Sequence, residues 1–244
     1  DNEWCIDIYA NAENFCDVTS KEKVQLVAEN RKLESKYSNK EVFLISDTNW
    51  KDVLSLVPIT TWTDNAQIIT YPTLIYHEED NAFDADSIIY FMQQYGPSRV
   101  TIIGESPQEL DNLLIASPEL GVGLGQSQIQ RISSNDYLSY WASFNKVVYV
   151  ENNYELALLA STYASLINAP LVIQGTNLDS QNLFSNREII CVGDVNPTGS
   201  CNEQYNLEQL QQKYVDETGT DKIMLVNPND LNIQVEGSFQ PEKS

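Results

Sequence analysis

The chain has 244 residues, of which 42% are hydrophobic and 20% are charged, a composition typical of a globular protein rather than a disordered one. Its 14 basic and 35 acidic residues give a formal net charge of -21 at pH 7, which argues against binding to nucleic acid or to an anionic membrane surface. The uncharged stretch Leu156–Leu178 is interrupted by polar residues and a proline, so we expect no membrane span.

The first 40 residues combine a cysteine pair with an amphipathic segment. We expect a short strand and a disulfide turn over Asp1–Val18, followed by a helix over Thr19–Tyr37. Because the chain begins at Asp1 without a signal-like apolar stretch, we expect a processed or excised segment of a longer protein.

The four cysteines form two local pairs, Cys5 with Cys16 and Cys191 with Cys201. Neither pair has the short C-x-x-C spacing of a zinc site, and His77 is the only histidine, so disulfides are favoured over a metal centre. Two disulfides predict an oxidising, extracellular compartment. The alternative is four reduced, buried thiols in a cytosolic protein.

From Glu41 onward, short apolar runs alternate with amphipathic segments. Glu41–Ser46 reads as a buried strand, and Asn49–Trp62 reads as a helix in which Pro58 predicts a kink or a late break. Ser106 and Glu109 have the spacing of a helix capping box. The other predicted elements here are strand Pro72–Tyr76, helix Ala85–Tyr95, strand Arg99–Ile103 and helix Ser106–Ala116.

A similar series follows Asn145. Lys146–Val150 is a short apolar strand, Tyr154 opens a helix, and Leu171–Gln174 is a strand after Pro170, which together predict a right-handed βαβ crossover. Glu188–Gly193 parallels the earlier Arg99–Gly104 as an apolar strand closed by glycine. This alternation predicts an α/β protein with mostly parallel sheets and helices on both faces.

The repetition suggests four sequence regions. Residues 1–40 form an N-terminal segment, residues 41–128 a first αβ repeat unit, and residues 129–206 a second unit. Residues 207–244 contain the helix Leu207–Thr218 and a strand at Asp221–Val226, which together open a third unit or a linker.

Five consecutive stretches carry a resemblance to a known family: Ile129–Ile132 (IQRI), Asp136–Phe144, Val147–Val150, Glu155–Leu166 and Ala169–Val172. In order and spacing they resemble the type 2 cell-wall-binding repeat of bacterial and archaeal surface proteins. The resemblance extends over roughly Glu41–Leu231 and implies tandem flavodoxin-like or Rossmann-like αβ units.

The resemblance implies a non-enzymatic, extracellular structural module of a surface-layer or envelope-associated protein. The expected partners are like subunits or other domains of a surface assembly, with an envelope polymer as a further candidate. Because the chain is strongly acidic, we expect lattice or filament assembly rather than direct binding to an anionic polymer. Two alternatives stay open: an extracellular hydrolase acting on wall polysaccharide or peptide through carboxylates, and a two-lobed small-ligand receptor.

Acidic turns offer the only metal candidates in the sequence. Asp80, Asp84 and Asp86, and a second polar cluster at Asn227–Asn232, offer the hard oxygen ligands that calcium prefers, but neither cluster has EF-hand spacing. Structural calcium at these residues is one hypothesis, and an acidic solvated turn is the alternative. No organic cofactor is expected.

Other motifs have an ordinary structural interpretation beside a functional one. The glycines Gly121, Gly123 and Gly125 lack the strand–helix context of a phosphate loop, which favours a connector. His77, among acidic neighbours, is interpreted as an exposed loop histidine rather than a catalytic one. Arg131 is expected to form an ion pair with a carboxylate of the neighbouring repeat unit rather than to bind a ligand.

The aromatic side chains also have two interpretations. Several of them suit sugar stacking, whereas the positions of Trp62 and Trp141 at the ends of predicted helices favour core packing. The full set is Trp50, Trp62, Tyr137, Tyr140 and Trp141.

Overall fold

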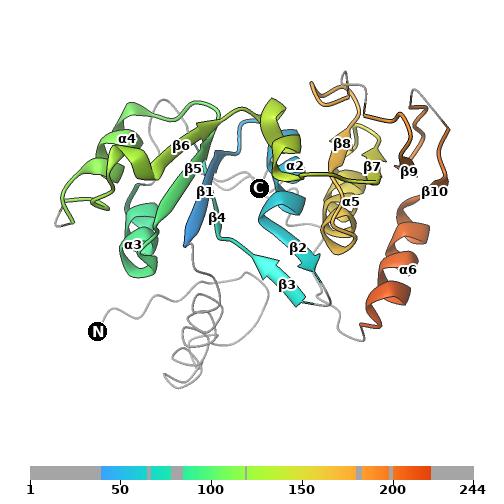
Figure 1. Ribbon diagram of the computed structural model, residues 1–244, viewed down its shortest axis with the longest axis horizontal. Helices are drawn as coiled ribbons and strands as arrows, with labels where there is room; N and C mark the ends of the chain where they lie inside the picture. Colours follow the sequence, from blue (N-terminus) through green and yellow to red (C-terminus); the bar gives the residue numbers. More distant parts are fainter. Residues whose placement is uncertain are drawn as a thin grey trace, which may run out of the picture. The chain divides into compact units, whose positions relative to one another are not determined.

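The computed structural model describes residues 40–64, 67–77, 85–118, 120–179, 183–197 and 200–220 (Figure 1). The chain divides into two compact units, Asp1–Lys40 and Glu41–Ser244, and every helix and strand described below belongs to the second. The strand, helix and Cys5–Cys16 disulfide predicted for the first unit lie outside the described residues, as does the strand predicted at Asp221–Val226.

The first sheet contains four parallel strands in the order β4-β1-β5-β6. The alternating faces of the central strands are both buried: Val42 and Leu44 pack beneath α3 and α4, and Phe43 faces the opposite side with α2. Figure 1 shows α3 and α4 on one side of this sheet and α2 on the other. The elements are β1 (Glu41–Ser46), α2 (Trp50–Thr60), β4 (Thr73–Tyr76), α3 (Ala85–Tyr95), β5 (Arg99–Ile103), α4 (Gln108–Ile115), β6 (Ile129–Ile132) and two 3-10 helices, η2 (Gln126–Gln128) and η3 (Ser134–Tyr140).

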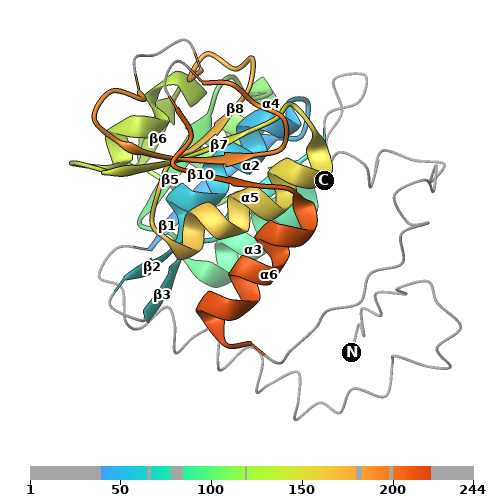
Figure 2. The ribbon, with the colours of Figure 1, turned by 90° about the vertical axis from the view of Figure 1, so that its right-hand side faces the viewer.

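The second sheet also has four parallel strands, in the order β10-β9-β7-β8. Helices α5 and α6 lie next to each other on one of its faces (Figure 2). On the other face, Leu178, Leu183 and Phe184 from the chain after β8 cover the strands. The elements are β7 (Lys146–Val150), α5 (Tyr154–Leu166), β8 (Leu171–Ile173), β9 (Glu188–Val192), β10 (Glu203–Tyr205) and α6 (Leu207–Thr218).

The two sheets have the same topology. In each, the second strand in chain order lies at one edge, followed across the sheet by the first, third and fourth. This is the flavodoxin-like order for four strands. The predicted α/β class with tandem flavodoxin-like units is therefore confirmed, although helices cover both faces of the first sheet and only one face of the second among the described residues.

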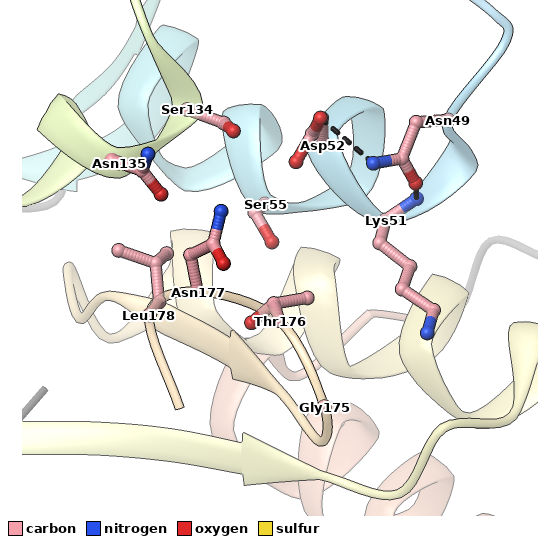
Figure 3. Close-up of a pocket in the computed structure, with 10 residues that line it drawn as sticks. All are labelled: Asn49, Lys51, Asp52, Ser55, Ser134, Asn135, Gly175, Thr176, Asn177 and Leu178. Atoms are coloured by element: carbon pink, nitrogen blue, oxygen red, sulfur yellow. Dashed lines mark hydrogen bonds between the residues drawn. The ribbon is translucent and has the colours of Figure 1, made fainter. Parts of the chain in front are cut away.

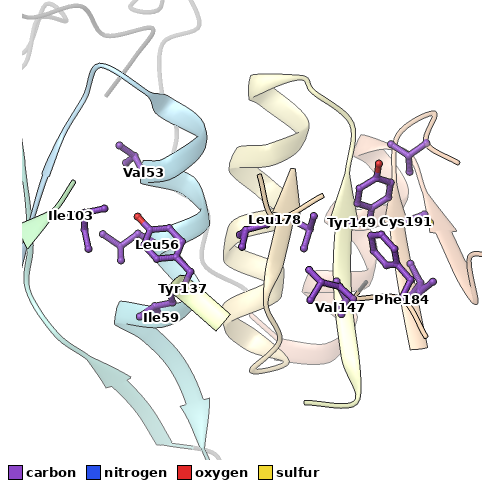
Figure 4. Close-up of a cluster of buried hydrophobic side chains, with 14 of the residues drawn as sticks. Val53, Leu56, Ile59, Ile103, Tyr137, Val147, Tyr149, Leu178, Phe184 and Cys191 are labelled. Carbon is purple, nitrogen blue, oxygen red and sulfur yellow. The ribbon is translucent and has the colours of Figure 1, made fainter. Parts of the chain in front are cut away.

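The equivalent helices of the two repeats pack side by side. The first residues of α2 and α5, Trp50 and Tyr154, meet edge to face with ring centroids 5.5 Å apart. A shared apolar cluster joins α2 and η3 to the second sheet, and Figure 4 shows Tyr137 beside Leu56 and Ile59 of α2. The two repeats therefore share a hydrophobic core.

The end of α2 and the start of α4 had local predictions with different outcomes. Helix α2 continues through Pro58 and ends two residues later, so the predicted late break is confirmed. An antiparallel hairpin of β2 (Thr61–Asp64) and β3 (Gln67–Thr70) follows the helix and was not predicted. The capping box at Ser106 is wrong, because α4 begins at Gln108 and the Ser106 hydroxyl donates to the Asp111 carboxylate at 2.7 Å.

The start of the second repeat also differs from its prediction. Strand β6 pairs with β5 in the first sheet, with Val100 opposite Ile129. The sheet topology therefore assigns Ile129–Ile132 to the first repeat as its fourth strand, whereas the second repeat unit was predicted to begin at residue 129.

Candidate functional site

A pocket opens at the carboxyl ends of the first sheet, between the neighbouring strands β1 and β5. The connections after these two strands turn to opposite faces of the sheet, which leaves a crevice where ligands bind in many α/β proteins. The pocket has a volume of about 310 Å³. Ile45 and Ile103 are its apolar lining, and the polar lining comprises Ser46, Thr48, Asn49, Asp52, Glu105, Ser133 and Ser134 together with the Gly104 backbone.

A second pocket of about 260 Å³ adjoins the first along α2. It lies between the N-terminal half of α2, the start of η3 and the turn after β8, and Figure 3 shows Thr176 and Asn177 of that turn opposite Ser55 of α2. Asn49, Asp52 and Ser134 line both pockets. We call the combined feature the polar cleft.

Two helix caps position the side chains of the polar cleft. The Asn49 side chain accepts a hydrogen bond from the backbone N–H of Lys51, and its amide donates to the Asp52 carboxylate at 2.8 Å. The Ser133 hydroxyl caps η3 by accepting from the N–H of Asn135. Cap residues are fixed by the backbone groups that they satisfy, so these polar groups are preorganised.

Asp52 is a carboxyl group of the polar cleft whose pKa is shifted. Burial raises its pKa, while hydrogen bonds from Ser134 and Asn49 act in the opposite direction. Its backbone carbonyl accepts a hydrogen bond from the Tyr137 hydroxyl at 3.1 Å. Glu105 lines the polar cleft, and Lys51 is the only basic residue among the described lining residues, so the polar cleft suits neutral, hydroxyl-rich groups better than anions.

The corresponding place in the second repeat is filled. Ile45 pairs with Ile103 in the first sheet as Val150 pairs with Val192 in the second, so Ser46 and Glu151 are equivalent, as are the glycines Gly104 and Gly193. The Glu151 carboxylate accepts the N–H of Asp194 at 3.0 Å. A Cβ placed on Gly193 would lie 2.5 Å from this carboxylate, whereas one on Gly104 would meet nothing within 4 Å. The crevice is therefore open in the first repeat and occupied by a side chain in the second.

The predicted exposed loop histidine proves to be partly buried and paired. His77 Nδ1 lies 2.8 Å from the Asp47 carboxylate, and Asp47 is only 5% exposed. The expectation was wrong because the residues after β1 and β4 meet at one edge of the sheet, where the Asp47 N–H also donates to the Tyr76 carbonyl. This pair links the ends of the two strands.

Arg131 also differs from its prediction. Its guanidinium pairs with the Asp111 carboxylate and donates to the Ser106 hydroxyl at 2.8 Å. Both partners belong to the first repeat rather than to the neighbouring copy, because β6 is part of the first sheet. Arg131 therefore fastens α4 to the fourth strand.

The predicted Cys191–Cys201 disulfide is confirmed, with Cα atoms 5.7 Å apart. It connects the end of β9 to the residues just before β10. In the first repeat, α4 lies at this point of the topology, between the third and fourth strands. The disulfide loop thus stands in the place of a helix.

The calcium hypothesis stays a prediction. Asp86 lies in the first turn of α3, while Asp80, Asp84 and the cluster Asn227–Asn232 fall outside the described residues. Within the described ranges, no group of three or more His, Cys, Asp or Glu side chains has the arrangement of a metal site.

The glycines after α4 have a packing explanation. A Cβ on Gly121 would lie 2.0 Å from the Leu113 carbonyl oxygen, and Gly123 has a φ of +79°. Their loop joins α4 to η2 and β6, which agrees with a connector.

Asn49, Asp52 and Ser134 were not predicted to belong to one site. Two signals were available: Asn49 and Ser133 each follow a short apolar run at the position of a helix cap, and the carboxyl ends of parallel strands meet at one edge. The missing information was the order of the strands.

Comparisons of the chain with models of protein families, with curated proteins and with solved structures found no match. The resemblance to the type 2 cell-wall-binding repeat therefore rests on the motif positions of the sequence. None of the helices in the described part of the chain has the length and apolar character needed to cross a membrane.

Proposed function

We propose that this chain is a non-enzymatic, extracellular module of a cell-surface protein, acting in a surface layer or envelope-associated assembly. The observation that carries the proposal is the duplication of one four-stranded parallel unit, with equivalent helices packed against each other. Tandem units that share a core are typical of repeat proteins, which present extended surfaces to partners. The motif resemblance to the type 2 cell-wall-binding repeat supports the same conclusion.

The disulfide and the charge support the proposed location. The Cys191–Cys201 disulfide is compatible with an oxidising compartment. A net charge of -21 disfavours an anionic wall polymer unless cations bridge the two. We therefore propose like subunits or other domains of the assembly as partners, with calcium at Asp80, Asp84 and Asp86 as a candidate bridge.

Assembly can be tested by electron microscopy and sedimentation of the purified protein, with and without millimolar calcium. Regular sheets or filaments, or cosedimentation with isolated envelopes, would support the proposal. Dispersed monomers that stay in the supernatant with envelopes under both conditions would overturn it. The triple variant Asp80→Asn, Asp84→Asn, Asp86→Asn separates calcium bridging from calcium-independent assembly.

A specific observation favours one alternative function, a hydrolase. Asp52 has a raised pKa and lines the same pocket as Glu105, and glycoside hydrolases use a general acid of raised pKa together with a second carboxyl group. Hydrolysis of wall polysaccharides that is lost in both Asp52→Asn and Glu105→Gln would support this candidate. Absence of hydrolysis by the wild type, or hydrolysis that neither substitution slows, would exclude it.

The two-lobed receptor is not favoured by the topology. The described strands of each sheet come from one continuous stretch of chain, 41–132 and 146–205, and a receptor hinge needs strands that cross between lobes.

A further inference from the structure

We propose that a groove between the two repeats binds a neutral saccharide by stacking a sugar ring on aromatic side chains. The groove is separate from the polar cleft and lies at the opposite, C-terminal end of α2, where α2, η3 and the residue after α5 come together. Its volume is about 290 Å³. The lining residues that matter are Trp62, Tyr140, Trp141, Ser143 and Asn168.

The aromatic side chains of the groove are held in place by neighbours outside it. Trp62 stacks on Tyr71 with ring centroids 5.9 Å apart, and Trp141 meets Phe144 edge to face. The Trp141 indole N–H donates to the Asn168 side-chain oxygen at 3.1 Å. Rings fixed in this way lose little conformational freedom when a ligand binds, which is the property of an effective recognition surface.

Tyr140 is anchored in the same manner but stays accessible. Its ring packs at an angle on Phe43, with the ring centroids 6.0 Å apart. The side chain is nevertheless 40% exposed. An anchored aromatic ring that remains at the surface is available for contact with a ligand.

The polar groups at the groove suit sugar hydroxyls. The Asn168 side-chain oxygen accepts from the Trp141 indole, so its amide nitrogen is left to donate to a ligand, and Ser143 is an exposed residue that adds a hydroxyl. Asn168 adopts a φ of +49°, a left-handed conformation that asparagine tolerates better than most residues. This is the usual conformation of the residue that follows a helix C-cap, and it fixes the position of the Asn168 side chain at the end of α5.

The ligand class follows from shape and charge. A sugar ring has an apolar face of C–H groups for an aromatic ring and hydroxyls at its rim for the amide and the serine. None of the described residues that line the groove is charged, and the chain has a net charge of -21, so an uncharged saccharide is favoured over an anionic one. The volume lies near the lower end of the roughly 300–1,000 Å³ of small-ligand pockets, which suits a short stretch of a glycan.

This inference deepens the proposed function and rests on it for the source of the saccharide, an envelope glycan. Since the lining comes from both repeats, a bound sugar would also contact both. The chemistry of recognition stands on the groove alone.

The test uses the full chain and a panel of uncharged oligosaccharides, namely gluco-, manno- and chito-oligosaccharides at millimolar concentration, with oligogalacturonate as the anionic comparison. Binding is followed by tryptophan fluorescence and by saturation-transfer NMR, which reports the sugar protons that touch the protein. We expect an uncharged oligosaccharide to bind through the C–H protons of one ring face, and oligogalacturonate to bind at least tenfold more weakly.

Variants locate the site. Trp62→Ala should weaken binding roughly tenfold or more, because central aromatic contacts dominate such interfaces. Asn168→Gly, which tolerates the positive φ, should weaken it several-fold. Tyr90→Ala is the matched control, since Tyr90 is an exposed aromatic residue on α3, outside the groove. Circular dichroism verifies that each variant is folded.

The outcomes separate this inference from the proposed function. Absence of binding by every uncharged saccharide, or equal binding by Trp62→Ala and Tyr90→Ala, would overturn the groove assignment even if the wild type still sediments with envelopes. Saccharide binding that depends on Trp62, in a protein that neither assembles nor sediments with envelopes, would confirm the groove and overturn the surface-module proposal.

Discussion

Tyr137 belongs to η3, in the segment that joins the two repeats, and connects this segment to α2. It is 1% exposed, packs in the cluster shared by both sheets, and donates its hydroxyl to the Asp52 carbonyl. Burial of the 150–250 Å² of an aromatic side chain at about 25 cal/mol/Å² corresponds to about 4–6 kcal/mol. Truncation to alanine leaves part of this contact and creates a cavity, so Tyr137→Ala should cost about 3–5 kcal/mol.

Tyr137→Phe separates the hydroxyl from the ring. The Asp52 carbonyl lies in the first turn of α2 and is not left without a partner by this change, so the expected loss is only about 1 kcal/mol. Because burial and the Asp52 carboxylate both raise the pKa of Tyr137, the phenol stays protonated at neutral pH and the hydroxyl remains a donor.

Urea denaturation followed by circular dichroism measures both losses as shifts of the midpoint at constant slope. Tyr90→Ala, 67% exposed on α3, is the control and should change stability by no more than about 0.5 kcal/mol. A loss below about 1.5 kcal/mol for Tyr137→Ala, or a loss equal to that of the control, would refute the claim that the two repeats share a core through this residue.

Three further predictions test the disulfide, the polar cleft and the filled crevice. Cys201→Ser should lower the free energy of unfolding by about 2–3 kcal/mol and the melting temperature by roughly 5–10 °C, measured by calorimetry; an unchanged melting temperature would contradict it. The folded pKa of Asp52 is raised above its unfolded value, so the stability linked to its protonated form is present at low pH and is lost as the pH rises through the folded pKa. Asp52→Asn should therefore be more stable than the wild type at pH 7, with no difference near pH 3 by urea titration; an equal gain at both pH values would refute the burial argument. Both Gly104 and Gly193 have a positive φ, but only a Cβ on Gly193 would meet the Glu151 carboxylate, so Gly193→Ala should be more destabilising than Gly104→Ala. Equal midpoints in urea would show that Glu151 does not fill the crevice.

The strands and helices of the fold were predictable because their signals are local. Buried β-branched runs such as Lys146–Val150, and the switch to helical periodicity after Asn153, identify elements without knowledge of distant contacts. The same holds for the Cys191–Cys201 disulfide, whose partners are ten residues apart. Local pattern alone therefore recovered the α/β class and the duplication.

Apart from the local errors at Ser106 and at the β2–β3 hairpin, the errors came from features that depend on strand order. Ile129–Ile132 has the composition of any short strand, and only its pairing with β5 places it in the first sheet. The mistaken partner of Arg131 and the mistaken exposure of His77 follow from the same missing information, because both side chains bind groups brought close by neighbouring strands. The polar cleft was missed for this reason too.

The two repeats have kept one topology and changed different parts of it. The first repeat retains helices between its second, third and fourth strands and keeps its crevice open beside Gly104. In the described part of the second repeat, neither connection contains a helix: the chain with Leu178 and Phe184 follows β8, and a disulfide loop follows β9. Glu151 fills the equivalent crevice. The open crevice of the polar cleft therefore belongs to the first repeat, while the turn after β8 in the second repeat lines the other side of the cleft. The second repeat also supports α2, the helix that carries Asp52, because α5 packs against it and Trp50 meets Tyr154 where the two helices begin. Both the polar cleft and the aromatic groove lie along this helix.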